Sequence, residues 1–226
     1  GTTLSQQGAT SIVADSLTLT ASSTYAVPSG KTLDLRNGSP FSAGDATGIL
    51  RINSSGTFTP TTTGNFTVAS STLLVYNGST ITNVASVNTV IDYGGTLSQG
   101  TYASTTSALT FSTITVQNGG NITHLANTTA QTNILNLGAT TMTVNAGGSL
   151  NVDSKGYSGG VLGGGGSENG KGPGGGTGLA SGGAGGGGHG GDGGDGSSVS
   201  GGSGYCDLTN PGTIGSGSGA GSSGSS

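Results

Sequence analysis

Few side chains in this protein are of the types that carry out catalysis. Of its 226 residues, nine are Asp or Glu and two are His. Hydrolysis of a polysaccharide, for example, needs two carboxylates about 5–10 Å apart. The carboxylates of the first two thirds of the chain stand alone, at Asp15, Asp34, Asp45, Asp92 and Asp153. Because no two of them are close in sequence, we predict that the protein is not an enzyme.

A glycine-rich stretch holds a weak metal-binding pattern. The sequence Gly-Gly-Asp-Gly-Gly-Asp-Gly at 190–196 is similar to the glycine–aspartate turns that bind calcium in repeat solenoids. The nine-residue period of those repeats does not recur, and Asp192 and Asp195 supply only part of a calcium shell. They are weak calcium candidates, with solvated turn residues as the alternative, and we predict no other cofactor. His124 and His189 lack the spacing of metal ligands.

Several asparagines stand in sequences that accept N-linked glycans. Six Asn-x-Ser/Thr sequences begin at Asn37, Asn53, Asn65, Asn77, Asn121 and Asn127. Because Ser, Thr and Asn are abundant, about five such sequences arise by chance. The number therefore proves nothing, but a source that glycosylates its surface proteins would find the turn positions Asn53 and Asn77 accessible. The glycosylation candidates are Asn53, Asn65, Asn77, Asn121 and Asn127.

The elements that position these residues are indicated by a spaced motif that recurs six times. Each copy has an aliphatic residue, a polar turn with glycine, and a second apolar residue six positions after the first. The copies run from Val27 to Leu33, Ile52 to Phe58, Val75 to Ile81, Ile91 to Leu97, Val116 to Ile122 and Val144 to Leu150. Their first residues are 25, 23, 16, 25 and 28 positions apart. These intervals suit one coil of a solenoid, except for 16, which marks an irregular coil or an accidental match.

Short runs of alternating apolar and polar residues, such as Phe66 and Val68, predict an all-β fold. We predict a parallel β-helix, or β-solenoid, because the motif repeats and because most turns contain Asn or Asp. These residues accept left-handed backbone and can form ladders between coils. We expect a thin core that favours aliphatic side chains over rings and includes Leu4, Val13 and Leu17. A β-sandwich is the alternative fold.

The composition excludes two classes of partner and favours self-association. Only 6% of the residues are charged, and the net charge is −4. The five basic residues are scattered, which argues against nucleic acid, and no apolar run approaches the length of a membrane span. With so little electrostatic repulsion, the chain is expected to stack or associate with itself. It opens at Gly1 without a signal peptide, so we expect a processed form or a piece of a longer protein.

The first residues of the chain form the predicted assembly strand. A β-helix has open edges at both ends, and an uncapped edge is a template for another strand. The opening segment contains no charge, proline or helix that would act as a cap. We predict assembly contacts at Thr2, Thr3, Leu4, Ile12 and Val13. The alternative is a cap supplied by other parts of a longer parent chain.

The chain changes character near Gly156. Residues 156–226 contain 33 of the 50 glycines. We therefore predict two domains, β-solenoid coils at 1–155 and a glycine-rich module at 156–226 that is truncated or continues in a longer chain. One interpretation of the module is a flexible linker. Residues such as Tyr157, Leu179 and Ile214, which interrupt the glycine at intervals, favour an ordered, glycine-packed lobe. Glycine there would serve close backbone approach or positive φ, or the tracts would lie side by side as extended threefold helices.

The glycine-rich region also resembles a known module. The residues that carry the resemblance are Lys155-Gly-Tyr157, Gly172-Pro173-Gly-Gly-Gly176, Gly188-His189-Gly190-Gly191-Asp192, Gly204-Tyr205-Cys206-Asp207 and Asn210-Pro211. This succession resembles a glycine-rich module of large extracellular or cell-surface, adhesin-like proteins with parallel β-helical coils. The resemblance implies a location outside the cell and a structural or adhesive role. Cys206 departs from it, because a small residue such as glycine is expected there; as the single cysteine, it forms no internal disulfide.

Two other classes of function leave traces in the sequence. Gly188-His189-Gly190 matches a tripeptide of pectin-hydrolysing β-helices, but their Arg-x-Lys partner is absent. Thr-x-Thr steps are typical of ice-binding solenoids, but here they do not fall in one place per coil, and β-propensity explains them.

The sequence as a whole predicts an extracellular structural protein, located at the cell surface and acting through strand and coil stacking. It would be a subunit of a surface fibre or filament, or a segment of a giant adhesin. Its partners would be copies of itself or neighbouring parts of a parent chain, together with surface glycans. The alternative is a carbohydrate-binding or carbohydrate-cleaving β-helix domain.

Overall fold

The protein is divided into two compact units. The computed structural model describes residues 3–14, 17–19, 23–35, 41–43, 48–53, 56–59, 64–76, 79–81, 87–100, 108–163, 166–207, 209 and 212–221. The first unit consists of Gly1–Leu125 and Leu135–Asn151, and the second of Ala126–Ile134 and Val152–Ser226. The second boundary lies close to the predicted change at Gly156. The contribution of residues 126–134 to the second unit has no compositional signal.

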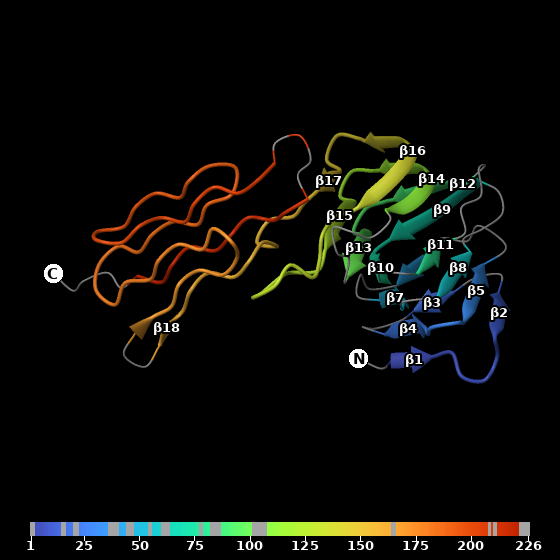
Figure 1. Ribbon diagram of the computed structural model, residues 1–226. Coiled ribbons are helices and arrows are strands. Elements are labelled where there is room, and N and C mark those ends of the chain that lie inside the picture. The colour runs from blue at the N-terminus through green and yellow to red at the C-terminus, as the bar shows by residue number, and fades with distance from the viewer. Residues whose placement is uncertain are drawn as a thin grey trace. The chain divides into compact units, whose positions relative to one another are not determined.

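The first unit is a parallel β-solenoid built from three sheets (Figure 1). Sheet A contains, in spatial order, β1 (Thr3–Ser5), β4 (Thr24–Val27), β7 (Gly48–Ile52), β10 (Ser71–Tyr76), β13 (Thr96–Gly100), β15 (Asn121–His124) and β17 (Ser149–Leu150). Sheet B contains β2 (Ser11–Ala14), β5 (Thr32–Leu35), β8 (Thr57–Thr59) and β11 (Thr80–Ile81). Sheet C contains β3 (Thr18–Leu19), β6 (Phe41–Ala43), β9 (Gly64–Ala69), β12 (Val87–Ile91), β14 (Leu109–Val116) and β16 (Leu137–Val144). All pairings within these three sheets are parallel, which confirms the predicted fold class.

The order of the strands along the chain follows the coils of the solenoid. From β1 to β12 successive strands belong to sheets A, B and C in turn, and every strand from β4 onward pairs with the strand three before it. From β13 to β17 the described strands alternate between sheets A and C. Among the described residues, no helix is long and apolar enough to cross a membrane.

The repeated motif marks two different corners of the coil, and this explains the interval of 16 residues. The first three copies join sheet A to sheet B: Val27 pairs with Ile52, which pairs with Val75. The last three copies join sheet C to sheet A: Ile91 pairs with Val116, which pairs with Val144. The interval from Val75 to Ile91 therefore separates two corners of one coil. It is neither an irregular coil nor an accidental match.

Paired glycines close the corner from sheet C to sheet A. At Gly94 the backbone has φ +68°, a left-handed conformation that glycine adopts without steric cost. The next residue, Gly95, donates its N–H to the Asp92 carbonyl at 2.7 Å, which closes a tight turn. A Cβ on Gly95 would lie 2.0 Å from the Val68 carbonyl oxygen of the preceding coil. The first glycine therefore supplies the turn, and the second allows the coils to approach each other.

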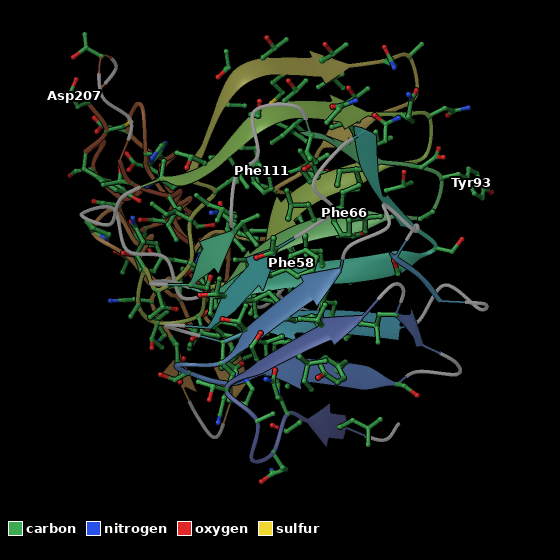
Figure 2. All side chains as sticks on the ribbon, turned by 90° about the vertical axis from the view of Figure 1, so that its right-hand side faces the viewer. Phe58, Phe66, Tyr93, Phe111 and Asp207 are labelled. Atoms are coloured by element: carbon green, nitrogen blue, oxygen red, sulfur yellow. The ribbon has the colours of Figure 1, made fainter. Side chains whose placement is uncertain are left out.

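Apolar side chains fill the space between the three sheets. Leu50, Leu73, Leu97 and Ile114 are among the fully buried side chains. The core also holds rings, although aliphatic side chains were expected to predominate: Phe58 and Phe66 meet edge to face with centroids 5.2 Å apart (Figure 2). Each buried side chain of this size contributes roughly 1.5–3 kcal/mol relative to an exposed one.

The described residues of the second unit are ordered without a side-chain core of this kind. Apart from a two-strand antiparallel pair, β18 (Leu162–Gly163) and β19 (Gly166–Ser167), the extended segments described there lie side by side without ladders of β-strands (Figure 1). Their backbone hydrogen bonds recur every third residue in both partners. Examples are Gly185 to Thr177 with Gly188 to Gly174, Gly202 to Gly186 with Tyr205 to His189, and Gly176 to Gly217 with Leu179 to Ala220. A period of three is that of polyproline II helices, so these hydrogen bonds indicate extended threefold helices lying side by side, one of the arrangements expected for the glycine tracts.

The absence of Cβ atoms allows these threefold helices to touch. A Cβ on Gly202 would lie 1.8 Å from the Gly174 carbonyl oxygen, and one on Gly170 would lie 1.9 Å from that of Gly217. Such distances are far below van der Waals contact, so no other residue fits at these positions without moving the neighbouring backbone.

Candidate assembly site

One inward-facing ladder of side chains runs through the whole of sheet A. Its members pair directly from strand to strand, in the order Leu4, Tyr25, Leu50, Leu73, Leu97, Ile122 and Leu150. The four members from Leu50 to Ile122 are 0% exposed. The two end members differ, because Leu4 is 59% exposed and Leu150 is 45% exposed. The side chains of this column are therefore fully buried in its middle and exposed to solvent at both ends.

The exposed ends coincide with the edges of the sheets. Within the described residues, β1, β2 and β3 are the last strands of sheets A, B and C at one end, and β17 and β16 end sheets A and C at the other. At the second end Met142, Val144 and Leu150 are exposed apolar residues. Edge strands present unpaired N–H and C=O groups that can pair with another strand.

The backbone groups of the two edges of sheet A point in defined directions. The Gln6 N–H donates to the Ala26 carbonyl at 3.2 Å, so Thr3 and Ser5 direct their N–H and C=O groups away from β4. At the other edge the Ser149 N–H donates to the Gly120 carbonyl at 3.1 Å and the Asn151 N–H to the Ile122 carbonyl at 2.9 Å. Leu150 therefore directs its own backbone groups away from β15.

The predicted assembly residues fall into two groups. Thr3 and Leu4 lie in the edge strand β1, whereas Thr2 lies outside the described residues. Ile12 and Val13 lie in β2, the edge of sheet B, which ends at β11 on its other side. The expectation that Leu4 and Val13 belong to the core is wrong: Leu4 has no described strand beyond it, and Val13 is 47% exposed. Val13 follows Ile12, whose strand partner Leu33 is buried, so Val13 lies on the opposite, outward side of β2.

Polar side chains lie in the core near the end of sheet A, where no local pattern in the sequence indicates them. The inward column that begins with Val27, Ile52 and Val75 continues with Gln99 and His124. Gln99 is fully buried, and its Nε2 donates to the Asn136 carbonyl at 2.9 Å while its Oε1 accepts the Asn136 N–H at 2.6 Å. The amide of Gln99 thus replaces a strand as the partner of this backbone. Such a paired amide satisfies buried polar groups that would otherwise be costly.

One side-chain hydrogen bond joins turn residues of successive coils at the corner from sheet C to sheet A. Asn145 donates from Nδ2 to Gln117 Oε1 of the preceding coil at 2.8 Å, so a single Asn–Gln pair stands where ladders of Asn and Asp were predicted. The corner glycines stack as well, because the Gly94 N–H donates to the Gly119 carbonyl and the Gly119 N–H to the Gly147 carbonyl.

Threonines align on the outer face of sheet C more regularly than the sequence indicated. Thr113 pairs with Thr141 and Thr115 with Thr143, so two Thr-x-Thr steps lie directly above each other. The first of these columns continues with Asn88 and Asn65. The second is interrupted by Val90, which is 7% exposed.

The weak calcium candidates have structural partners in the second unit. Asp192 Oδ1 accepts the Gly204 N–H at 2.7 Å, and Asp195 Oδ1 accepts the Gly201 N–H at 2.9 Å. Both the acids and the amides are three residues apart, so these carboxylates follow the period of the threefold helices. Among the described residues, no three His, Cys, Asp or Glu side chains are grouped in a way that could hold a metal ion.

The glycosylation candidates differ in accessibility. Asn65 is exposed in β9, Asn53 and Asn121 are half-buried, and Asn77 lies outside the described residues. Asn127 is 5% exposed, and its Nδ2 donates to the Asn133 and Lys155 carbonyls, both at 2.8 Å. A glycan attached to that nitrogen would break these bonds, so Asn127 is unsuitable for modification in the folded protein.

His189, Tyr205 and Cys206 lie together in the second unit, where the N–H groups of Tyr205 and Cys206 both donate to the His189 carbonyl. The rings of His189 and Tyr205 meet edge to face with centroids 5.2 Å apart, and His189 Nε2 lies 3.2 Å from the Thr213 carbonyl oxygen. Burial raises the pKa of Tyr205 above its ordinary value, while a hydrogen bond from Ser216 Oγ at 2.8 Å acts in the opposite direction. Cys206 is a half-buried free cysteine.

Comparisons with known protein families, with curated proteins and with solved structures find no match to this chain. The resemblance of the glycine-rich region therefore stays a prediction.

Proposed function

We propose that this protein is an extracellular structural protein, a fibre or filament subunit that acts through the stacking of its coils. The observation that carries the proposal is the inward ladder of sheet A, which is dry in its middle and ends in exposed leucines on two edge strands. The low charge of the chain supports the same proposal, because little repulsion opposes association. Its partners are copies of itself, and the proposal includes no catalytic step or cofactor.

Sedimentation velocity of the purified chain over a hundredfold range of concentration tests this proposal. The expected result is a shift from a species of 21.3 kDa to heavy species as the concentration rises. Negative-stain electron microscopy of the heavy fraction should then show filaments of uniform width. A single light species at every concentration, without filaments, would contradict self-assembly and favour a segment of a larger adhesin.

A second candidate is carbohydrate binding, which the outer polar column of Asn65, Asn88, Thr113 and Thr141 favours. Hydroxyl and amide groups repeating at about 4.8 Å along a flat sheet can bond to a polysaccharide surface. Co-sedimentation with insoluble polysaccharides, together with an assay for released reducing sugar, separates binding from cleavage. The double variant Thr113→Val/Thr141→Val should abolish any binding on this face, and the outward pair Thr72→Val/Thr96→Val in sheet A is the matched control.

A further inference from the structure

The two edges of sheet A are complementary to each other. Leu4 and Leu150 are the first and last members of one inward column, and both are exposed. We propose that β17 of one copy pairs in parallel with β1 of a second copy, so that Leu150 stacks on Leu4 and the column continues across the joint. This joint rests on the proposed function and names the contact through which it operates.

The hydrogen bonds of the joint follow from the register inside the solenoid. In the existing coils a later residue donates to the residue before its partner, as when the Asn121 N–H donates to the Gly95 carbonyl at 3.0 Å. Continuing this rule, the Ser5 N–H of the second copy donates to the Leu150 carbonyl of the first. The Leu150 N–H donates in turn to the Thr3 carbonyl. These are the backbone groups that the two edges direct outward, so the joint satisfies them without any change of strand direction.

Sheets B and C do not extend in the same way within the described strands. Sheet C ends at β16 and at β3, but the register puts Thr18 of β3 in the column of Asn145, one residue after β16 ends. Sheet B ends at β11, which is followed by two further coils of sheets A and C. The joint therefore uses Thr3 and Leu4, whereas Ile12 and Val13 stay outside it.

A second copy of this chain is the occupant because the two edges belong to the same column and have the same register. A head-to-tail contact between two different edges leaves one free edge of each kind, so it generates an open filament and not a closed dimer.

Disulfide trapping in the native register tests the joint. In the full chain with Cys206→Ser, the pair Thr3→Cys and Ser149→Cys places cysteines on residues that the proposed register makes direct neighbours across the joint. Paired strands lie about 4.8 Å apart, which a disulfide can span. The matched control combines Thr3→Cys with Asn151→Cys, two residues out of register and roughly 8 Å away, beyond the span of a disulfide. Oxidation with copper–phenanthroline should give a ladder of covalent oligomers with the first pair and single chains with the control.

A second variant tests the ladder without cysteines. Leu4 is exposed in a single copy, so Leu4→Lys should fold normally by circular dichroism, but it would bury a charge in the joint. We expect the concentration needed for assembly to rise by about tenfold or more.

The outcomes distinguish the joint from the proposed function. A covalent ladder confined to the in-register pair, with weaker assembly of Leu4→Lys, supports the joint. Heavy species and filaments without that ladder, and with Leu4→Lys assembling as the parent does, overturn the joint but leave self-assembly standing. If the unmodified chain sediments only as a light species at every concentration, both the joint and the proposed self-assembly are overturned.

Discussion

The two units of this protein pair their backbone N–H and C=O groups in different ways. In each unit these groups form hydrogen bonds to neighbouring segments of the chain. In the solenoid the side chains alternate with a period of two, so one set of residues forms a core between the sheets. In the glycine-rich unit the bonds repeat with a period of three, and the segments approach each other because the glycines at their contacts have no side chains.

This difference predicts which substitutions destabilise each unit. Removing a side chain from the solenoid leaves a cavity in its core. Adding a single carbon to the glycine-rich unit forces two backbones apart. The same alanine substitution is therefore expected to damage one unit by being too small and the other by being too large.

The largest effect is expected from an added methyl group in the glycine-rich unit. Gly202→Ala would place a Cβ 1.8 Å from the Gly174 carbonyl oxygen, and we expect a loss of about 3 kcal/mol or more. Gly194→Ala is the matched control, because a Cβ there meets nothing within 4 Å. Hydrogen–deuterium exchange should rise across residues 156–221 for Gly202→Ala and stay unchanged for Gly194→Ala. Equal protection in both variants would contradict the close-packed arrangement.

The reverse experiment removes a side chain from the solenoid. Leu73 is fully buried in the inward ladder, and Leu73→Ala should cost about 2–5 kcal/mol through lost burial and a cavity. Its neighbour Leu74 faces outward and is half-buried, so Leu74→Ala should cost less than about 1 kcal/mol. Urea unfolding measures both. If the two variants have the same midpoint, the inward and outward faces of sheet A are wrongly assigned.

A smaller effect separates backbone conformation from packing at a corner. Gly94 has φ +68°, but the nearest atom to an added Cβ is Ser70 Cα at 3.4 Å, an ordinary contact. Gly94→Ala should therefore cost about 1–2 kcal/mol for the left-handed backbone alone. Gly94→Asn should cost less, since asparagine tolerates this conformation. If Gly94→Ala and Gly94→Asn lose the same stability in thermal unfolding, steric contact of the side chain, and not the left-handed φ, determines which residue position 94 accepts.

The sequence predicted the class of fold because its signals are local. Each apolar–turn–apolar copy contains a complete corner, so its spacing was visible without any knowledge of the partners. The spacing alone did not reveal which sheets each copy joins, because the seven-residue motif turns from sheet A to B at Val27 and from C to A at Ile91. The glycines do differ between the two corners, since the first kind has one glycine, as at Gly30, and the second has two, as at Gly94 and Gly95. The meaning of that difference depends on the pairing of distant coils, which the sequence does not show.

The candidate site was only partly predictable for the same reason. The chemistry of the opening segment indicated an unprotected edge, and Thr3 and Leu4 do lie on one. Leu150 was visible only as a member of a motif, because its place in the column of Leu4 depends on six successive pairings. Gln99 in the core has no local signal either, since its partner Asn136 is 37 residues away.

The smallest effects compare one tyrosine in each unit. Tyr25 lies in the inward ladder, and its buried hydroxyl has no hydrogen-bond partner among the described residues. The hydroxyl of Tyr205 donates to the Ile214 carbonyl and accepts a hydrogen bond from Ser216. Tyr25→Phe should therefore leave the free energy of unfolding unchanged or raise it by up to about 1 kcal/mol. Tyr205→Phe should lower it by about 1 kcal/mol, because it removes a satisfied bond.

Alkaline pH sharpens this last comparison. Burial raises the pKa of Tyr25 above its ordinary value of 10.0, so the folded protein retains a proton that the unfolded chain releases. The contribution of Tyr25 to the free energy of unfolding is therefore fully present below pH 10, and it is lost as the pH rises through and beyond that value. Tyr25→Phe should remove part of this alkaline loss, which unfolding in urea at pH 8 and at pH 10.5 would measure. An identical loss in the parent and in Tyr25→Phe would place the alkaline sensitivity elsewhere and would mean that the Tyr25 hydroxyl is open to solvent in the folded protein.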